Sequence, residues 1–279
     1  MRYLLLFLLT ISPGAVRGEV PTAAELTKQG WDAASFGLVT ESFDFFTRAV
    51  AADPSRENRY GLALALLNVP PKSDGNLDRA SEMFQTLRNE KDDDAYGVAS
   101  MYWLARVEEV HRLPRRPERA VIVYKELEAL YPGTLWAEMS AAKRCTIELC
   151  NVPPSQVTLE NLQQWKQMAD TVLKRPETKR ELYFAIASAA SNQAQTDEIR
   201  RIALECQIAA DAVGSVRRTA AATGLIRVGT LGILLNEPAL ALDYYNRYLT
   251  RFNRDVRRYL VEQIITNIKA GKTGEEALP

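Results

Sequence analysis

Residues 120–127 of this chain of 279 residues read Ala-Val-Ile-Val-Tyr-Lys-Glu-Leu, and Ala120, Tyr124 and Leu127 are spaced to share one face of a helix. A central, usually aromatic residue with an apolar residue three positions later recurs every 38 to 41 residues. The central residues are Phe46, Phe84, Tyr124, Trp165, Cys206 and Tyr245, and four positions before them stand Ser42, Ala80, Ala120, Asn161, Ile202 and Ala241. A small residue lets a paired helix approach and the ring fills the remaining space, so the pattern predicts stacked helix pairs.

The segments between these copies carry helix-breaking residues at regular places. Pro54, Pro70, Pro132 and Pro176 fall between periodic segments, and Pro238 falls where a helix would start. No segment alternates apolar and polar residues between hairpin turns. The sequence therefore predicts an all-α fold.

Two of the repeats carry most of a known signature. The first has Leu26, Gly30, Ser42, Phe46, Ala49 and Pro54, and the last has Leu225, Gly229, Ala241, Tyr245 and Tyr248. Over most of residues 23–253 the chain resembles the tetratricopeptide repeat family, and the Tyr131-Pro132-Gly133 exit followed by Trp136 is similar to repeats of bacterial envelope members. The resemblance implies an α-solenoid of about six antiparallel helix pairs that form a right-handed superhelix. Because the spacing is near 40 residues and not 34, another helical repeat with a period of about 40–47 residues stays open.

The chain is expected to divide into four segments. Residues 1–18 are typical of a secretory signal peptide, with Arg2 before an apolar core and Gly18 at the cleavage site, so the mature protein would be periplasmic or secreted. Residues 19–253 form the repeat domain, and residues 254–270 a capping helix with Tyr259, Val261, Ile264, Ile265 and Ile268 on its apolar side. Residues 271–279 are expected to be a flexible tail.

The charge pattern excludes some partners. The chain has 35 Lys and Arg against 35 Asp and Glu, so no whole-molecule attraction to nucleic acid is expected. The apolar run at residues 215–235 is interrupted by Arg217, Arg218 and Arg227, which favours a buried helix over a membrane span. No integral membrane segment is expected after cleavage of the signal.

The residues that usually carry chemistry are scarce. His111 is the only histidine, and Cys145, Cys150 and Cys206 form no Cys-x-x-Cys pair. The thiols are expected to be buried, and whether two of them form a disulfide stays open. Asp92 to Asp94 are expected to cap a helix that begins near Ala95. We therefore expect no catalytic residues, no metal and no cofactor.

The leading functional hypothesis is a non-enzymatic scaffold that binds a peptide or helix of a partner protein on a concave face. By family resemblance, the candidate contact residues on first helices are Trp31, Thr223, Ile226 and Thr230. An arginine-rich elbow formed by Arg112, Arg115, Arg116 and Arg119 is a second candidate surface. Two alternatives stay open: an enzyme acting on envelope glycans with a Glu general acid, and an oligomeric component in which the terminal helix packs on another subunit.

Overall fold

The computed structural model describes residues 21–151, 157–192, 196–214 and 218–279, and every regular element within them is helical. The expected signal peptide at residues 1–18 lies outside the described residues. The chain divides into two compact units, Met1–Met83 and Phe84–Pro279, and the boundary falls within helix α4 (Asp74–Glu90). Each unit is described by itself.

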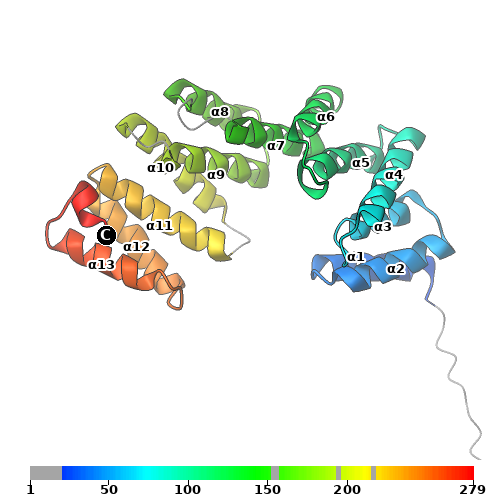
Figure 1. Ribbon diagram of the computed structural model, residues 1–279, viewed down its shortest axis with the longest axis horizontal. Coiled ribbons are helices and arrows are strands. Elements are labelled where there is room, and N and C mark those ends of the chain that lie inside the picture. Colours follow the sequence, from blue (N-terminus) through cyan, green and yellow to red (C-terminus); the bar gives the residue numbers. More distant parts are fainter. Residues whose placement is uncertain (1–20, 152–156, 193–195, 215–217) are drawn as a thin grey trace, which may run out of the picture. The chain divides into compact units, whose positions relative to one another are not determined.

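The first unit contains α1 (Ala23–Ser35), α2 (Val39–Ala52), α3 (Arg56–Leu66) and the start of α4 (Figure 1). Helix α1 begins with a capping box, in which the Thr22 hydroxyl accepts from the amide of Glu25 and the Glu25 carboxylate accepts from the amide of Thr22. Helix α2 packs against both α1 and α3. Consecutive helices therefore form the core of this unit.

Phe46 shows why small residues are needed in this packing. Its ring, on α2, is 1% exposed and lies against the backbones of Gly30 on α1 and Gly61 on α3. A Cβ atom at Gly30 would fall 2.9 Å from the ring, and one at Gly61 would fall 2.3 Å from it. Both helices can approach the ring because neither position has a side chain.

The second unit continues the chain of helices after the end of α4. Its elements are α5 (Ala95–Arg106), a π-helical turn η1 (Val107–His111), α6 (Pro117–Leu130), α7 (Leu135–Asn151), α8 (Leu159–Thr171), α9 (Pro176–Asn192), α10 (Asp197–Val213), α11 (Arg218–Leu234), α12 (Pro238–Arg251), α13 (Arg258–Lys269) and a 3-10 helix η3 (Gly274–Ala277). As predicted, Asp94 caps α5, accepting from the amides of Tyr96 and Gly97. Helices α6 and α12 begin with Pro117 and Pro238 in their first turns.

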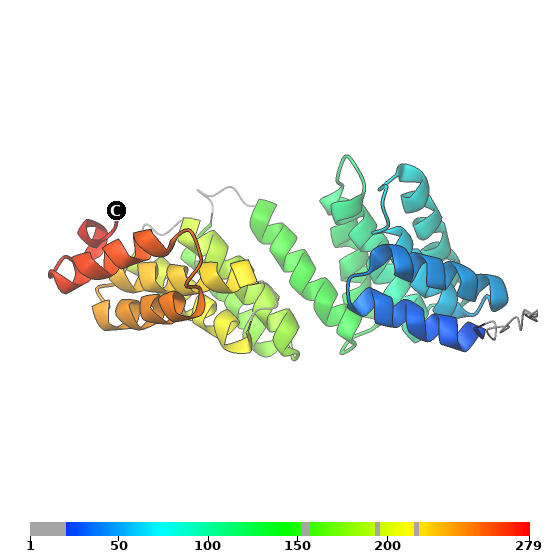
Figure 2. The same ribbon diagram turned by 90° about the horizontal axis from the view of Figure 1, so that it is seen from below.

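Packing in the second unit follows the order of the sequence. Helix α6 packs on α5 and α7, and each helix from α8 to α12 packs on the helix that follows it (Figures 1 and 2). Contacts also link α5 with α7, α7 with α9, and α8 with α10. This sequential packing is all-helical and solenoid-like, as the repeat pattern predicts.

The repeat pattern locates the core on the even-numbered helices, with one error. Five of the six predicted central residues are buried: Phe46 on α2, Phe84 on α4, Tyr124 on α6, Cys206 on α10 and Tyr245 on α12. On α8 the prediction is wrong by one position. Trp165 and Met168 pack against the core but stay partly exposed, as does Asn161, whereas Leu162 and Ala169 are completely buried. This register puts Lys166 at the central position, where its ammonium pairs with Asp170 at 3.1 Å.

The C-terminal segment differs from its prediction in two details. Helix α13 buries Val261, Ile264, Ile265 and Ile268 as predicted, but Tyr259 is 77% exposed and does not belong to the apolar side. The expected flexible tail instead forms η3, which packs against α11 and α13. Ala277 is completely buried there, and its carbonyl oxygen accepts from the side-chain nitrogen Nδ2 of Asn267 at 3.2 Å. Burial of one small residue and one hydrogen bond fix this short segment.

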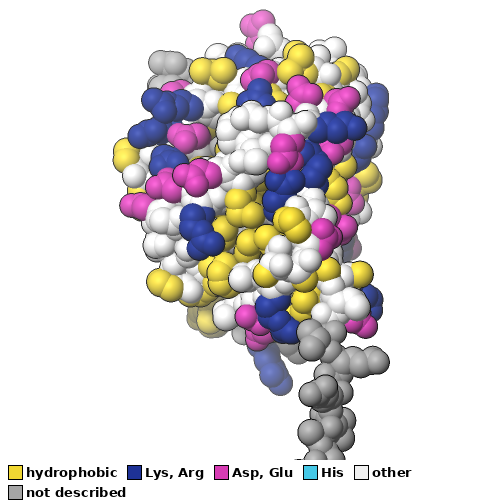
Figure 3. All heavy atoms as spheres, turned by 90° about the vertical axis from the view of Figure 1, so that its right-hand side faces the viewer, with side chains coloured by type: hydrophobic (Ala, Val, Ile, Leu, Met, Phe, Trp, Pro, Cys, Tyr) yellow, Lys and Arg dark blue, Asp and Glu magenta, His cyan; other side chains and the backbone are white. Residues whose placement is uncertain are grey.

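The surface shows no segregation of charge on the face drawn in Figure 3, where acidic and basic side chains are interspersed. Among the described residues, no helix has the length and apolar character needed to cross a membrane. The apolar helix α11 instead lies within the largest hydrophobic core, to which it contributes Leu225, Val228 and Leu231. Arg227 therefore belongs to a helix packed against other helices, as predicted, whereas Arg217 lies outside the described residues.

Candidate functional site

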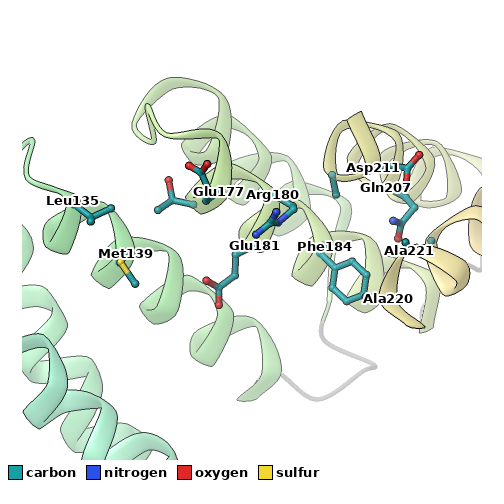
Figure 4. Close-up of a pocket in the computed structure, with 13 residues that line it drawn as sticks. Leu135, Met139, Glu177, Arg180, Glu181, Phe184, Gln207, Asp211, Ala220 and Ala221 are labelled. Carbon is teal, nitrogen blue, oxygen red and sulfur yellow. The ribbon is translucent and has the colours of Figure 1, made fainter. Parts of the chain in front are cut away.

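A hollow with a volume of about 750 Å³ lies in the second unit. We call it the α9 pocket, because α9 lies at its centre (Figure 4). It is lined by Leu135 and Met139 of α7, by Glu177, Thr178, Arg180, Glu181 and Phe184 of α9, by Gln207, Ala210 and Asp211 of α10, and by Ala220, Ala221 and Gly224 of α11. Its volume falls in the range of sites that hold small ligands or peptide side chains.

Helical spacing brings these side chains together. Glu177, Glu181 and Phe184 follow one another along one face of α9, as Leu135 and Met139 do on α7 and Ala220 and Gly224 do on α11. Every second helix of the sequence, α7, α9 and α11, therefore presents a stripe of side chains to the same pocket. Helix α10 contributes side chains between α9 and α11, and Figure 4 shows Gln207 and Asp211 on that side.

The charged groups of the pocket are mostly engaged within the protein. Glu181 pairs with Lys143, Arg180 donates to the carbonyl oxygen of Gly214 at 2.9 Å, and Arg247 lies 3.4 Å from a carboxylate oxygen of Asp211. Glu177, at the N-terminal end of α9, is exposed. The remaining walls are largely apolar, so the pocket has an apolar interior and a charged rim.

Gln207 is the buried polar side chain at the pocket's inner wall. It is 2% exposed, and its Oε1 accepts a hydrogen bond of 3.0 Å from Nη1 of Arg227. Because a guanidinium can only donate, this bond fixes which end of the amide is the oxygen. The Nε2 of Gln207 then faces Gly224, where a Cβ would fall 2.9 Å away.

Arg227, on α11, does not line the pocket itself but contacts two residues that do, Gln207 and Phe184. Its Nη1 also donates to Ser188 Oγ at 2.9 Å, and its Cζ lies 5.3 Å from the ring centre of Phe184. No carboxylate of the described residues forms an ion pair with it. Burial lowers the pKa of Arg227 from its ordinary value, although an arginine remains charged at neutral pH. Within the part of the chain that the structure describes, the contacts of this half-buried guanidinium are with neutral groups.

Trp31 lies in the first unit and is not a lining residue of the α9 pocket. Its ring meets Phe46 edge to face at 4.8 Å, and its Nε1 donates to Glu57 at 3.0 Å. It also borders a hollow of about 470 Å³ together with Thr27, Asp53 and Asn58. The indole is therefore a packing residue with one edge on a small polar hollow, and its role in partner binding stays a prediction.

The three predicted contact residues of α11 do not line the α9 pocket. The Thr223 hydroxyl accepts from Arg257 at 2.9 Å, and the Thr230 hydroxyl lies 3.0 Å from that of Tyr245. Ile226 packs against the hydrophobic core. Helix α11 is enclosed by α10, α12 and η3, so these side chains make contacts within the fold.

The arginine-rich elbow follows η1, which ends at His111. Glu108 holds two of its members, with an oxygen 3.1 Å from Arg112 Nε and another 3.8 Å from Arg116 Nη1. Arg115 and Arg119 are exposed. The elbow thus presents two exposed cations beside two that are bound to one carboxylate.

Other groups relevant to chemistry have structural surroundings. Cys145 and Cys206 are buried as expected but Cys150 is exposed, and all three are free thiols. The described residues contain no group of three potential metal ligands. Where the pKa of a carboxyl group is shifted, at Glu25, Glu138 and Asp255, it is lowered. These carboxyl groups are held in the ionised form, whereas a general acid needs a raised pKa.

No protein-family model and no curated protein matches this chain. Function must therefore be inferred from the site. The sequence prediction missed Gln207 as well as Glu177 and Phe184, and it noted Arg227 only as an interruption of an apolar run. That interruption was the available signal, because a charge within a buried helix needs an explanation.

Proposed function

We propose that this protein is a non-enzymatic binding scaffold of the tetratricopeptide type, exported to the periplasm or secreted, and that the α9 pocket receives a peptide or helix of a partner protein. In this proposal the helices form antiparallel pairs in a superhelix. The first helices of successive pairs, among them α7, α9 and α11, line its concave face. The observation that carries the proposal is the convergence of these three helices on one pocket of about 750 Å³.

The chemistry of the pocket supports binding over catalysis. Its interior is apolar, and Glu181 and Asp211 are both paired with cations. Glycan hydrolysis would need a carboxyl group held protonated in a cleft, and the shifted carboxyl groups of the described residues have lowered pKa values. An oligomer formed through α13 remains the second structural hypothesis, since Tyr259 and Leu260 leave apolar surface exposed there.

A pocket-filling variant tests the proposal. Ala220→Trp places a large ring in the α9 pocket, whereas Ala239→Trp places the same ring on an exposed position of α12. In affinity capture from the envelope fraction, we expect wild type and Ala239→Trp to retain a partner that Ala220→Trp loses. Equal unfolding midpoints would show that all three proteins are folded. Retention of the same partners by Ala220→Trp would contradict the proposal.

The proposed export has its own test. Mass spectrometry of the N-terminal peptide of the protein purified from the envelope fraction should identify Glu19 as the first residue, because Gly18 precedes the predicted cleavage site. A chain that still carries residues 1–18 would contradict this part of the proposal.

A further inference from the structure

The guanidinium of Arg227 has unused donor capacity. An arginine has five N–H donors, and the two on Nη1 are directed to Ser188 and Gln207. Nε and Nη2 have no acceptor among the described residues, and neither nitrogen belongs to the buried unpartnered atoms. Arg227 is partly exposed, so part of its side chain is reachable from solvent. The Nε and Nη2 edge is the side of a guanidinium that binds a carboxylate through two parallel hydrogen bonds.

The surroundings of Arg227 prepare it for an anion. A half-buried charge is costly unless an opposite charge compensates it, and here the neighbours are a hydroxyl, an amide oxygen and an aromatic ring. These three contacts restrict the side chain before any ligand binds, which reduces the entropy lost on binding. None of these three neighbours carries a negative charge, so an anion that reached the guanidinium would meet no competing carboxylate among them.

Two of the same neighbours connect this charge to the α9 pocket. Phe184 and Gln207 both line the pocket and both contact Arg227. Glu177 lies seven residues before Phe184 on α9, a rise of about 10 Å, so its charge is largely screened at that distance. An apolar group in the pocket would therefore have a cation beside it on the Arg227 side.

We propose that the α9 pocket recognises a partner peptide in which a bulky apolar side chain stands next to an aspartate or glutamate, with the apolar side chain in the pocket and the carboxylate on Nε and Nη2 of Arg227. This inference rests on the proposed function, because it assumes that the pocket receives a peptide. It adds the chemical class of the ligand. The amide nitrogen of Gln207 supplies a further donor for a peptide carbonyl at the inner wall.

Four fluorescein-labelled nonapeptides test the inference with the full-length mature protein. Each has a glycine–serine background with a central pair Leu-Glu, Leu-Gln, Leu-Lys or Ala-Glu, and binding is measured by fluorescence polarisation. We expect Leu-Glu to bind at least about tenfold more tightly than Leu-Gln, since a charged bidentate pair replaces a neutral contact. Leu-Lys should bind more weakly still, and Ala-Glu should lose the contribution of the apolar side chain.

Variants locate the preference on Arg227. Arg227→Lys keeps the positive charge but not the planar fork, so the preference for Leu-Glu over Leu-Gln should fall several-fold, and Arg227→Gln should abolish it. The matched control is Arg254→Gln, which removes an exposed arginine elsewhere and should leave the preference unchanged.

Three results would overturn the inference. The first is equal affinity of wild type for the Leu-Glu and Leu-Gln peptides, and the second is absence of binding by every peptide. The third is tighter binding of octanoate, an apolar carboxylate that is not a peptide, than of the Leu-Glu peptide. The comparison among peptides uses wild-type protein, so it does not depend on the folding of any variant. If Ala220→Trp loses the captured partner while Leu-Glu and Leu-Gln bind equally, the proposed function stands and the carboxylate assignment fails.

Discussion

At the scale of single residues, Tyr124 combines a packed ring with a buried hydrogen bond. It is completely buried, and its hydroxyl donates to Glu109 at 2.5 Å. Burial, together with the neighbouring Glu109, raises the pKa of Tyr124 above its ordinary value, so the hydroxyl keeps its proton. Tyr124→Ala should lower the free energy of unfolding by about 3–5 kcal/mol. Tyr124→Phe should cost about 1–3 kcal/mol, because it removes the donor alone.

Urea unfolding followed by circular dichroism measures both losses, with the exposed Lys72→Ala as a control that should leave the midpoint unchanged. An unchanged midpoint for Tyr124→Ala would mean that the ring does not fill the space between α5, α6 and α7.

At the glycines where helices contact, replacement by alanine should lower stability, which is opposite to its usual effect in a helix. Alanine normally stabilises a helix relative to glycine by about 1 kcal/mol. At Gly61, however, the new Cβ would fall 2.3 Å from Phe46, so Gly61→Ala should destabilise by about 1–3 kcal/mol. At Gly75 the nearest atom is 4.0 Å away, and Gly75→Ala should be neutral or stabilising. Thermal unfolding of the two variants compares them directly, and an equal effect on both midpoints would contradict the close approach of α2 and α3.

Arg227 marks the limit of residue-level prediction. The sequence shows a charge within an apolar run, which correctly predicts a helix packed against other helices. It does not show which face the charge occupies. That face depends on α11 lying between α10 and α12, and on Gln207 and Ser188 reaching the same point from two other helices. Long-range neighbours of this kind leave no local pattern.

At the scale of elements, Glu138 ties one helix to the turn between two others. Its carboxylate, on α7, accepts from the backbone amides of Lys174 and Arg175 at 3.0 and 2.9 Å and from the Arg175 guanidinium at 2.7 Å. Burial alone would raise the pKa of Glu138, but these donors outweigh it and hold the pKa below 4.5. The ionised form therefore stabilises the connection between α8 and α9.

The sign of the pH effect follows from the lowered pKa. Stability from Glu138 is fully present above about pH 4.5 and is lost as the pH falls through the lowered value. Glu138→Gln should reduce the free energy of unfolding by about 2 kcal/mol at pH 7. The difference from wild type should shrink at pH 3.5. Urea unfolding at both pH values measures it, with the exposed Glu177→Gln as control; a difference that grows on acidification would contradict the assignment.

The elements also show where a repeat pattern succeeds and where it fails. Small residues and rings at fixed spacing correctly place the core of α2, α4, α6 and α12, because these helices follow one template. On α8 the template selects Trp165, the largest side chain nearby, although Leu162 and Ala169 face the core. Ring size alone cannot set the register when the neighbouring turn of the helix offers a smaller apolar residue that fits better. The C-terminal tail fails for a related reason, since Ala277 is fixed by contacts with α11 and α13.

At the scale of the whole molecule, regular spacing of the repeats is enough to predict an all-helical chain with sequential packing. It does not predict two compact units with a boundary inside α4. The apolar positions Leu77, Ala80, Phe84 and Leu87 continue along α4 without a break, and all four are buried. A boundary between two units that leaves the helix and its row of apolar residues uninterrupted changes neither composition nor periodicity, so the sequence does not indicate where it falls.

The elbow and the α9 pocket should contribute to partner binding in different ways. Arg115 and Arg119 are exposed, whereas Arg112 and Arg116 are bound to Glu108, so the exposed pair provides the free charge. Exposed charges act over about 8 Å at physiological ionic strength and mainly change the rate of association. We expect Arg115→Glu with Arg119→Glu to slow association of the captured partner about tenfold at low salt and to have little effect at high salt.

A second double variant separates the elbow from net charge. Arg254→Glu with Lys272→Glu makes the same change of charge at two other exposed positions and should slow association much less. Surface plasmon resonance at several salt concentrations measures the association rate and the dissociation rate separately. Ala220→Trp should abolish binding at every salt concentration because it fills the pocket. Equal slowing by both double variants would assign the effect to overall charge, since a local contact must depend on where the charges lie. In that case the elbow would be a solvated turn, and recognition would belong to the pocket alone.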